Sequence, residues 1–485
     1  MTRAARLPTG RQLVLTWSIP ADYGGLTAAL LQRSRLFDRR GGAAVDVLTC
    51  DDREDHARVA AELARRDALS ERVRVVNLWD WLRTDTLRGR AVSPADGFAP
   101  LASGDEGVVE DRSGGHVVRR VRRDAAGAVQ QIDHLRPDGS LAASDRRDVP
   151  RADGRVRRRV VTCDADGAPL AAFSGVRAVY TAWLDRVTGG EPSFLLVDSK
   201  TMARFATTYR RRHVVVLHIV HGSHLTDEGD AVRPSRAEVF GKLAAFDAVV
   251  FCTDRQAQDA RRMAGRLPLL LTVPHPVRVR EVDTTAPREG VAVVARLEPI
   301  KRVEDALAAV RRARTEEPGL TLDVYGDGPA GDTLRAIAGE DGGIRFHGFD
   351  PNAGEALRER SVLLLTSKSE AFSLVIAEAM AAGCLPIAYD VPYGPRELIL
   401  DSRTGWLVPS GDVAALTDAV IRAGRLTPEE TARMRRAAVE RARLYDEDAV
   451  LARWAGALER ASRRQRLRRQ AWRVREVLRR RLGVR

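Results

Sequence analysis

The chain has 485 residues and a formal net charge of +13, so it is long enough for two or three domains and basic enough to favour anionic partners. It contains no apolar run near the roughly 18 residues that span a bilayer. Aromatic residues make up only 5% of the chain, and no stacking motif is visible, so nucleic acid is not an expected partner.

The N-terminal segment MTRAARLPTGRQLVL is basic but lacks the apolar stretch and cleavage site of a secretory signal. The four cysteines are scattered without the spacing of a metal site: Cys50, Cys163, Cys252 and Cys384. We therefore expect reduced cysteines and a cytoplasmic location.

A β-α-β pattern opens the chain, with a strand at 11–18, a helix at 28–40 and a strand at 45–50. Between 85 and 190 the pattern changes, because short alternating stretches are separated by the turn signals DAAG, PDG, ADG and DADG. Such repeated turns are typical of successive hairpins. This region therefore predicts an antiparallel β-meander inserted into an α/β domain.

Apolar strands resume at PSFLLVD, HVVVLHIV and FDAVVFCT, and the two prolines of LPLLLTVPHPV mark a hinge. A second α/β series runs from GVAVVARL to SVLLLTS. We expect two Rossmann-like, doubly wound parallel-sheet domains facing a cleft. The predicted parts are an N-terminal domain from 1–84 and 191–278, an inserted sheet at 85–190, a C-terminal domain at 279–445 and a basic helix at 446–485.

The basic helix at 446–485 has two interpretations. Its apolar positions follow helical spacing, with arginines around the rest. It either packs across the domains with a solvated arginine face or lies on an anionic membrane surface or polyanion.

The segment SEAFSLVIAEAM, residues 369–380, has a glutamate near each end of an apolar stretch. Glu370 follows a predicted buried strand, and a helix is expected from about Phe372 to Gly383. Ligands of open α/β sheets bind beyond the carboxyl ends of strands, and a helix N-terminus suits a phosphate. Glu378 and Glu370 could then accept hydrogen bonds from ribose and sugar hydroxyls. Alternatively, residues 367–370 form a capping box and Glu378 is a solvated helix residue.

Two further segments bear on this site. In VAVVARLEPIKR, Arg296 and Lys301 follow a strand and could neutralise a diphosphate, although ordinary surface charge is an alternative. YGDGPAGD fits G-x-G-x-x-G at Gly326, Gly328 and Gly331, which keeps a nicotinamide-dependent oxidoreductase open. However, this loop follows the second strand of its domain and contains a proline.

Three histidines, His218, His221 and His224, lie at or beyond one predicted strand. No cysteine or acidic residue accompanies them closely, so no metal is expected. His218 is interpreted as structural. His221 and His224 are placed at the mouth of the cleft, where a substrate contact and a structural role are both open.

Taken together, RLEPIK, YGDGP, FHG and SEAFSLVIAEAMAAG resemble, in family order, the retaining glycosyltransferases of family 4, which have the GT-B fold. The continuation AYDVPYGPRELILDSRTGWLVPSGD resembles the branch of poly(glycerol-phosphate) and poly(ribitol-phosphate) glycosyltransferases and the enzymes that glycosylate serine-rich adhesins. The opening YGGLTAALLQRSRLF, HGSHL and the meander are similar to that branch. There the meander serves oligomerisation or acceptor contact.

The resemblance implies a role for each candidate site residue. Arg296 and Lys301 would bind the donor diphosphate, Glu378 the ribose and Glu370 the donor sugar. Ala371 and Ser373 stand where the family often has glycine, which leaves the sugar preference open. The remaining implied donor-site residues are Gly25, His221, Gly326, His347 and Gly348 and the backbone N–H groups of Phe372, Ser373 and Leu374.

The resemblance also implies the activity. A hexose or N-acetylhexosamine would move from a UDP-sugar, with retention and without a metal or other cofactor, to a hydroxyl of an anionic cell-wall polymer such as poly(glycerol phosphate) teichoic acid. A protein Ser or Thr is the alternative acceptor. Apart from the resemblance, the charge and spacing of the basic helix leave a contact with the inner face of the membrane open beside packing on the domains. The inserted sheet would form a homo-oligomer or contact the acceptor, as in that branch.

Overall fold

The structure is a computed structural model that describes residues 5–20, 23–53, 55–151, 153–226, 229, 231–263, 268–350 and 352–482. Its contacts divide the chain into two compact units. One unit comprises Met1–Pro8, Tyr23–Gly42 and Leu217–Arg485, and the other comprises Thr9–Asp22 and Ala43–Val216. The four domain boundaries expected from the sequence remain predictions.

The second unit contains the two parallel strands of the β-α-β arrangement that the sequence predicts, and the helix between them in the chain, α1 (Gly25–Arg39), is part of the first unit. The strands of the second unit pair in parallel, with Leu13 of β1 opposite Leu195 of β10 and Val14 of β1 opposite Val47 of β2. Nearly every residue of β1, β2 and β10 is buried, which is typical of strands covered on both faces. The elements are β1 (Arg11–Leu15), β2 (Val45–Thr49), α2 (His56–Arg65), β3 (Val73–Asn77), α3 (Leu78–Trp81), η1 (Pro94–Asp96), α4 (Val176–Thr188), β10 (Ser193–Val197) and α5 (Lys200–Ala206).

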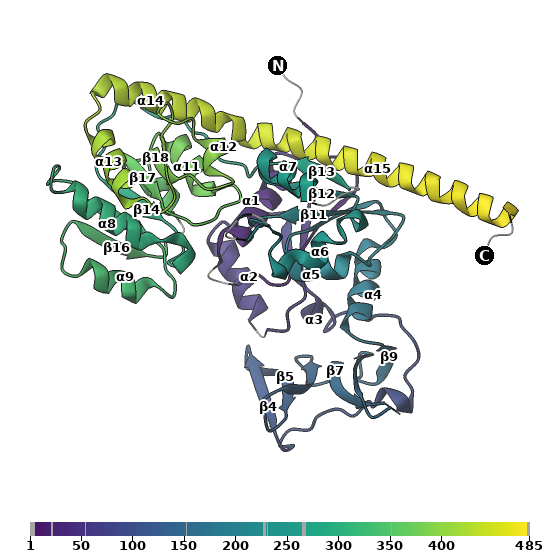
Figure 1. Cartoon of the computed structure of the whole chain (residues 1–485). Coiled ribbons are helices and arrows are strands. Elements are labelled where there is room, and N and C mark those ends of the chain that lie inside the picture. Colours follow the sequence, from purple (N-terminus) through teal and green to yellow (C-terminus); the bar gives the residue numbers. More distant parts are fainter. Residues whose placement is uncertain are drawn as a thin grey trace. The chain divides into compact units, whose positions relative to one another are not determined.

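The same unit contains a six-stranded antiparallel sheet in which each strand pairs with the next (Figure 1). The four turn signals of the sequence connect β5 to β9, as expected; for example, the N–H of Gly127 donates to the carbonyl of Asp124 at 2.9 Å. The first hairpin, which turns at Gly114 and Gly115, carries no such signal. The strands are β4 (Val108–Ser113), β5 (His116–Arg123), β6 (Val129–Leu135), β7 (Leu141–Pro150), β8 (Val156–Cys163) and β9 (Pro169–Phe173).

The first unit carries the remaining strands of the N-terminal parallel sheet, whose order is β13-β12-β11-β10-β1-β2-β3. Val220 at the end of β11 is opposite Phe251 of β12, which is opposite Thr272 of β13. The three strands therefore end at the same edge. The elements are α1 (Gly25–Arg39), β11 (Val214–Val220), α6 (Pro234–Phe240), η2 (Leu243–Ala245), β12 (Ala248–Phe251), α7 (Asp254–Met263) and β13 (Leu269–Thr272).

A second parallel sheet follows in the first unit, with the order β16-β15-β14-β17-β18-β19. From β14 the chain first moves outward through β15 to β16 and then in the other direction from β17, so right-handed crossovers place helices on both faces. The elements are β14 (Val291–Val294), η3 (Pro299–Lys301), α8 (Val303–Ala313), β15 (Leu322–Tyr325), α9 (Gly331–Ala338), β16 (Ile344–Gly348), α10 (Ala353–Ala356), β17 (Val362–Leu365), α11 (Leu374–Ala382), β18 (Leu385–Tyr389), α12 (Pro395–Leu398), β19 (Trp406–Val408), α13 (Val413–Gly424), α14 (Pro428–Ala442) and η4 (Arg443–Tyr445).

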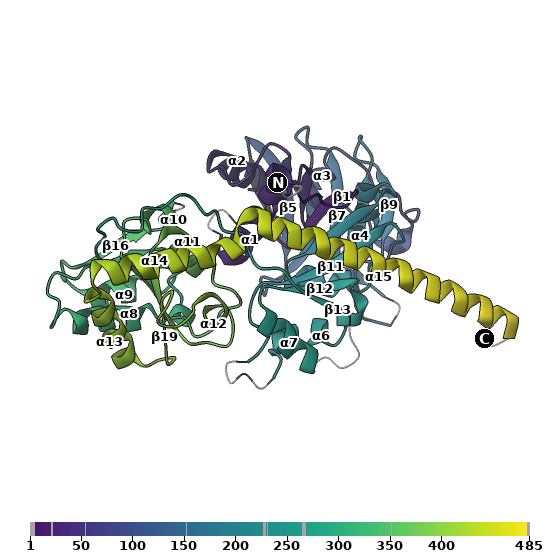
Figure 2. The same cartoon turned by 90° about the horizontal axis from the view of Figure 1, so that it is seen from above.

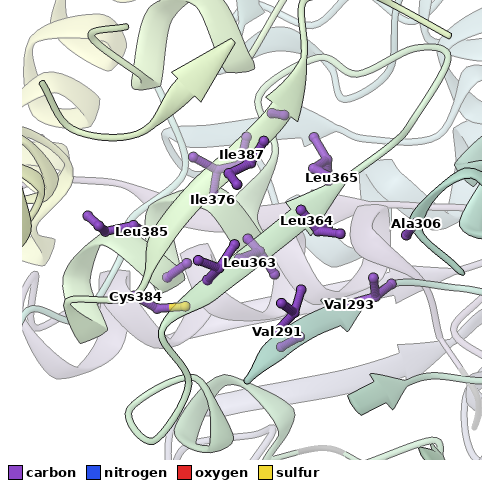
Figure 3. Close-up of a cluster of buried hydrophobic side chains, with 14 of the residues drawn as sticks. Val291, Val293, Ala306, Leu363, Leu364, Leu365, Ile376, Cys384, Leu385 and Ile387 are labelled. Atoms are coloured by element: carbon purple, nitrogen blue, oxygen red, sulfur yellow. The ribbon is translucent and has the colours of Figure 1, made fainter. Parts of the chain in front are cut away.

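The core of this second sheet is built from its central strands. Figure 3 shows Val291 and Val293 of β14, Leu363 of β17, Ile376 of α11 and Ile387 of β18 as members of one buried cluster. Each of these side chains is at most 2% exposed. This packing fixes the ends of β14 and β17 relative to each other.

The long helix α15 (Glu447–Leu482) runs past α1 and β13 (Figure 2). Trp454 packs edge-on against Phe37 of α1 with ring centroids 5.7 Å apart, and the Arg33 guanidinium lies 5.3 Å from the centre of the Trp454 ring. The first part of the helix is therefore a packed element, whereas Leu467 is 65% exposed. None of the helices searched among the described residues is sufficiently long and apolar to cross a membrane.

Candidate active site

A lysine and a glutamate meet where the strand order of the C-terminal sheet reverses. Lys301 follows β14 and Glu370 follows the neighbouring strand β17, and Lys301 Nζ lies 2.7 Å from Glu370 Oε1. The two side chains are 25% and 12% exposed, so the ion pair is partly buried. Ligands of open α/β sheets bind at this kind of switch point.

The backbone holds the two sides of this ion pair together. The Thr366 hydroxyl donates to the carbonyl of Lys301 at 2.8 Å, and the Lys368 N–H donates to the carbonyl of Ile300 at 2.8 Å. The loop that carries the lysine is thereby attached to the loop that carries Glu370.

Arg296 lies against the start of α1. A Cβ added to Gly24, the N-cap of that helix, would lie 2.9 Å from Arg296 Cδ, so a larger residue there would displace the Arg296 side chain. Arg296 also pairs with Glu298, with Nη2 2.6 Å from Oε1. A Cβ added to the predicted residue Gly25 would meet nothing within 4 Å, so open space adjoins it.

The glycine-rich loop after β15 supports the segment that contains Arg296. A Cβ at Gly326 would lie 1.8 Å from the carbonyl oxygen of Ala295, and one at Gly328 would lie 2.6 Å from that of Leu297. In addition, the Leu297 N–H donates to the Asp327 carbonyl at 2.9 Å. These glycines are explained by close backbone packing.

The loop between Glu370 and α11 adopts an unusual conformation. The helix begins at Leu374, and its N-cap, Ser373, has φ of 72° and no side-chain capping bond. The alternative of a capping box at 367–370 is therefore wrong. A Cβ at Gly394 would lie 2.5 Å from the Phe372 carbonyl oxygen, so Gly394 packs directly on this loop and keeps it out of the helix.

Glu378 lies in the second turn of α11. Its side chain is only partly exposed, and burial raises the pKa of its carboxyl group. The nearest part of α10 is Gly354, whose added Cβ would lie 3.9 Å from Glu378 Oε2. A carboxylate in such surroundings gains from hydrogen-bond donors supplied by a ligand.

His347 is held in place on β16. Its Nε2 lies 2.7 Å from Asp323 Oδ1, and its ring stacks on Tyr325 with centroids 4.4 Å apart. Burial acts to raise the pKa of Asp323, but hydrogen bonds from Arg345 and His347 outweigh it and lower that pKa. The anionic Asp323 therefore accepts from Nε2. Gly348, the next residue, accepts from the Gly326 N–H at 2.7 Å.

The three histidines of the N-terminal half separate in the structure. His218 is buried within β11 and lies near Phe246. His224 is fully buried and stacks between Phe240 and Tyr393, so the expectation that it lines the mouth of a cleft is wrong. His221 lies just past β11 and stacks parallel to His275, with centroids 5.4 Å apart.

The predicted residues thus include two that pair, Lys301 with Glu370, and three that lie together, Gly326, His347 and Gly348, whereas Arg296 lies against Gly24, the neighbour of the predicted Gly25. Phe372 links the C-terminal loop to the N-terminal strands, because its ring meets His275 edge-on at 5.4 Å. Sequence reasoning missed His275 and the packing role of Gly394. The sequence does carry a signal for each. His275 in VPHP comes just after a predicted strand, and Gly394 is the glycine of YGP.

A sequence family described as "Glycosyl transferases group 1" matches residues 288–425, which run from just before β14 to the end of α13. The match covers the C-terminal sheet and the candidate residues on it, so this part of the chain is similar to glycosyl transferases of group 1. The candidate residues on the N-terminal side lie outside this match.

Three relatives align with part of the chain. An exopolysaccharide phosphotransferase of Streptomyces coelicolor is 32% identical over 37% of this chain and 20% of its own length. The poly(glycerol-phosphate) alpha-glucosyltransferase of Bacillus subtilis is 23% identical over 48% of this chain and 36% of its own length. The GtfA subunit of the UDP-N-acetylglucosamine–peptide N-acetylglucosaminyltransferase of Streptococcus pneumoniae is 26% identical over 49% of this chain and 50% of its own length. The chain thus matches half or less of each relative.

Two solved structures share the fold over 93% of this chain. TarM of S. aureus, in complex with fondaparinux, alpha-GlcNAc-glycerol and UDP, superposes with a TM-score of 0.72 at 15% identity and is covered over its full length (100%). The pneumococcal O-GlcNAc transferase GtfA, in complex with UDP and GlcNAc, superposes with a TM-score of 0.70 at 18% identity and 99% coverage. These likenesses confirm the GT-B fold.

Proposed function

We propose that the chain is a retaining glycosyltransferase that moves a hexose or N-acetylhexosamine from a UDP-sugar to a hydroxyl group of an anionic polymer such as poly(glycerol phosphate). The observation that carries the proposal is the Lys301–Glu370 pair at the switch point of a sheet that is similar to glycosyl transferases of group 1. A cation and an acid side by side suit a ligand that has a diphosphate next to sugar hydroxyls.

The donor would use the groups that surround this pair. Lys301 and Arg296 would stabilise the negative charge that develops on the departing UDP. Glu378, whose carboxyl pKa is raised by burial, would accept hydrogen bonds from the ribose hydroxyls. The N–H groups at the start of α11 point out of the helix and would donate to phosphate and sugar oxygens.

In the proposed reaction, the acceptor oxygen forms a bond to the anomeric carbon on the face from which UDP departs. The bond between that carbon and the β-phosphate oxygen breaks, and the departing phosphate oxygen takes the acceptor proton. This route retains the anomeric configuration. It uses neither a protein nucleophile nor a metal ion.

The acceptor is proposed from two observations. The chain has a net charge of +13, which attracts a polyphosphate. The relative from Bacillus subtilis is named for poly(glycerol phosphate). A protein Ser or Thr is the second candidate, favoured by the relative named for peptide N-acetylglucosaminyl transfer.

The inserted antiparallel sheet and the basic helix supply the remaining proposed contacts. We propose a cytoplasmic enzyme that associates with itself through β4–β9 and lies at the inner face of the membrane through the arginine-rich part of α15. Flotation with vesicles of anionic or zwitterionic lipid tests the second contact. Binding only to anionic vesicles, weakened by salt, is the expected result.

The function itself is tested with a panel of UDP-sugars. Each UDP-sugar is incubated with the full chain alone, with poly(glycerol phosphate) and with a serine-rich peptide, and UDP release is measured. One UDP-sugar is expected to give polymer-dependent UDP release, with an α-linked product by NMR. Release that depends on the peptide would select the second candidate, and no release with any pair would overturn the proposal.

A further inference from the structure

Three possible metal ligands converge at the edge of the N-terminal sheet, outside the lysine–glutamate pair. His221, Cys252 and His275 each offer one ligand atom, and these three atoms all lie within 4.8 Å of one another. Cys252 Sγ and His275 Nε2 are the closest measured pair, 3.4 Å apart.

The fold explains why residues so distant in the sequence meet. His221 directly follows β11, and Cys252 directly follows β12, at positions that the strand register places side by side. His275 comes shortly after β13, which ends in the same register. Three neighbouring parallel strands therefore present their ligands at one edge, on a rigid framework.

We propose that His221, Cys252 and His275 form a binding site for a borderline-soft divalent cation, with Zn²⁺ as the best match. One thiolate and two imidazoles are ligands that Zn²⁺ prefers, whereas Mg²⁺ and Ca²⁺ require oxygen ligands, and the cluster contains none. Three protein ligands leave a fourth position for water or another small ligand.

The geometry requires only a small adjustment. In a tetrahedral zinc site with bonds of about 2.0–2.3 Å, ligand atoms lie roughly 3.3–3.8 Å apart. The widest separation here is thus about 1 Å too long, which rotation of the partly exposed imidazoles can close. Cys252 is 2% exposed, and its thiol lies 3.6 Å from the Val220 carbonyl. On binding, this thiol releases its proton to solvent and the sulfur bonds to the metal.

A cavity lies beside the cluster. Cys252 and Pro274, the neighbour of His275, help to line a cavity of about 540 Å³. The other lining residues come mainly from α7, α12 and the region 441–453. The cavity therefore adjoins two of the three segments that supply the ligands. The edge of Phe372 covers His275 from the C-terminal side.

Cobalt(II) binding to the full chain, freed of metal with a chelator, tests the proposal. One Co²⁺ per chain is expected, with a thiolate-to-cobalt charge-transfer band that Zn²⁺ abolishes. Cys252→Ser should lose that band, whereas Cys384→Ser, which removes another fully buried cysteine outside the cluster, should keep it.

His275→Gln is the second variant, for the case in which Cys252→Ser fails to fold. It should weaken Co²⁺ binding at least about tenfold while circular dichroism stays unchanged. Absence of the band in the native chain, or a band that survives in folded Cys252→Ser, would overturn the proposal. Sugar transfer is not measured in any arm, so the outcome is independent of the proposed function.

Discussion

Lys301 and Glu370 form an ion pair across the ends of two neighbouring parallel strands, with 2.7 Å between Nζ and Oε1. Because β14 and β17 flank the point where the strand order reverses, the pair lies where the sheet opens to a ligand. The glutamate thereby holds the lysine amino group at this edge of the sheet.

Replacing this lysine tests its proposed electrostatic role. Lys301→Ala should lower sugar-transfer turnover at least about 100-fold, because a charge next to the departing diphosphate is lost. Steady-state UDP release is the measurement. Lys242→Ala is the matched control, since Lys242, which lies between α6 and η2, is exposed and pairs with Glu238. Near-normal turnover in Lys301→Ala would refute the assignment.

Gly394 is expected to be essential to the stability of the loop before α11. An added Cβ would lie 2.5 Å from the Phe372 carbonyl oxygen, and φ is +74°. Gly339 also has a positive φ, +58°, but its Cβ would meet nothing within 4 Å. Gly339→Ala should lower the free energy of unfolding, measured in urea, by about 1 kcal/mol, because only backbone strain is added. Gly394→Ala should lower it by about 2 kcal/mol more, because the close contact adds to the strain. Equal losses would show that the close contact is unimportant.

Ser373→Gly should stabilise the chain and weaken donor binding. Ser373 has φ of 72°, a region that favours glycine, and within the described residues its buried hydroxyl has no hydrogen-bond partner. Removing both features should add about 1 kcal/mol to the free energy of unfolding. The KM for the UDP-sugar should rise, because glycine loosens the backbone whose N–H groups are proposed to bind the donor.

Ser367→Gly provides the comparison for that variant. The Ser367 hydroxyl is likewise buried and without a partner among the described residues, but Ser367 is not among the described non-glycine residues with positive φ. Its replacement should therefore gain nothing from relief of strain. Should both variants change stability equally, strain at Ser373 would play no part.

Because His224 is buried, we expect the folded chain to lose stability in mild acid. Burial lowers the pKa of His224 to about 4, from 6.5 in the unfolded chain. Between these two pH values the imidazole binds a proton in the unfolded chain but not in the folded chain. Protonation therefore favours the unfolded chain. The stability that neutral His224 contributes is fully present above pH 6.5 and is lost as the pH falls to about 4. The loss amounts to roughly 3 kcal/mol.

His224→Phe keeps the stacking on Phe240 and Tyr393 but removes the titrating group. The free energy of unfolding, measured from pH 7 to pH 4, should fall less steeply in this variant than in the native chain. His116→Phe, at an exposed position of β5, serves as the control and should leave the slope unchanged. The interpretation fails if the slope in His224→Phe is that of the native chain.

Patterns within single segments predicted most of the fold. The apolar strands at 11–15 and 291–294 and the turn signals of the antiparallel sheet depend on local chemistry, so the sequence displays them directly. That Lys301 and Glu370 lie close together could also be predicted, because both residues were expected to follow strand ends and such ends meet at one edge of a sheet.

Relationships between segments were harder to predict. The start of α11 was placed too early because Gly394, far along the chain, holds Phe372 out of the helix. His224 was misplaced because its burial depends on Phe240 and Tyr393, which no spacing rule connects to it. The glycines of YGDGPAGD fit a nucleotide-binding pattern, yet close packing on Ala295 and Leu297 accounts for Gly326 and Gly328.

The contact of α15 with α1 has a consequence for biosynthesis. Arg40 and Glu447, which pair beside Phe37 and Trp454, are 407 residues apart in the chain. A ribosome therefore completes α1 long before it makes the residues that cover it. The apolar face of α1 should await a chaperone or stay transiently uncovered during translation, and the first unit should reach its final packing only after α15 has been made.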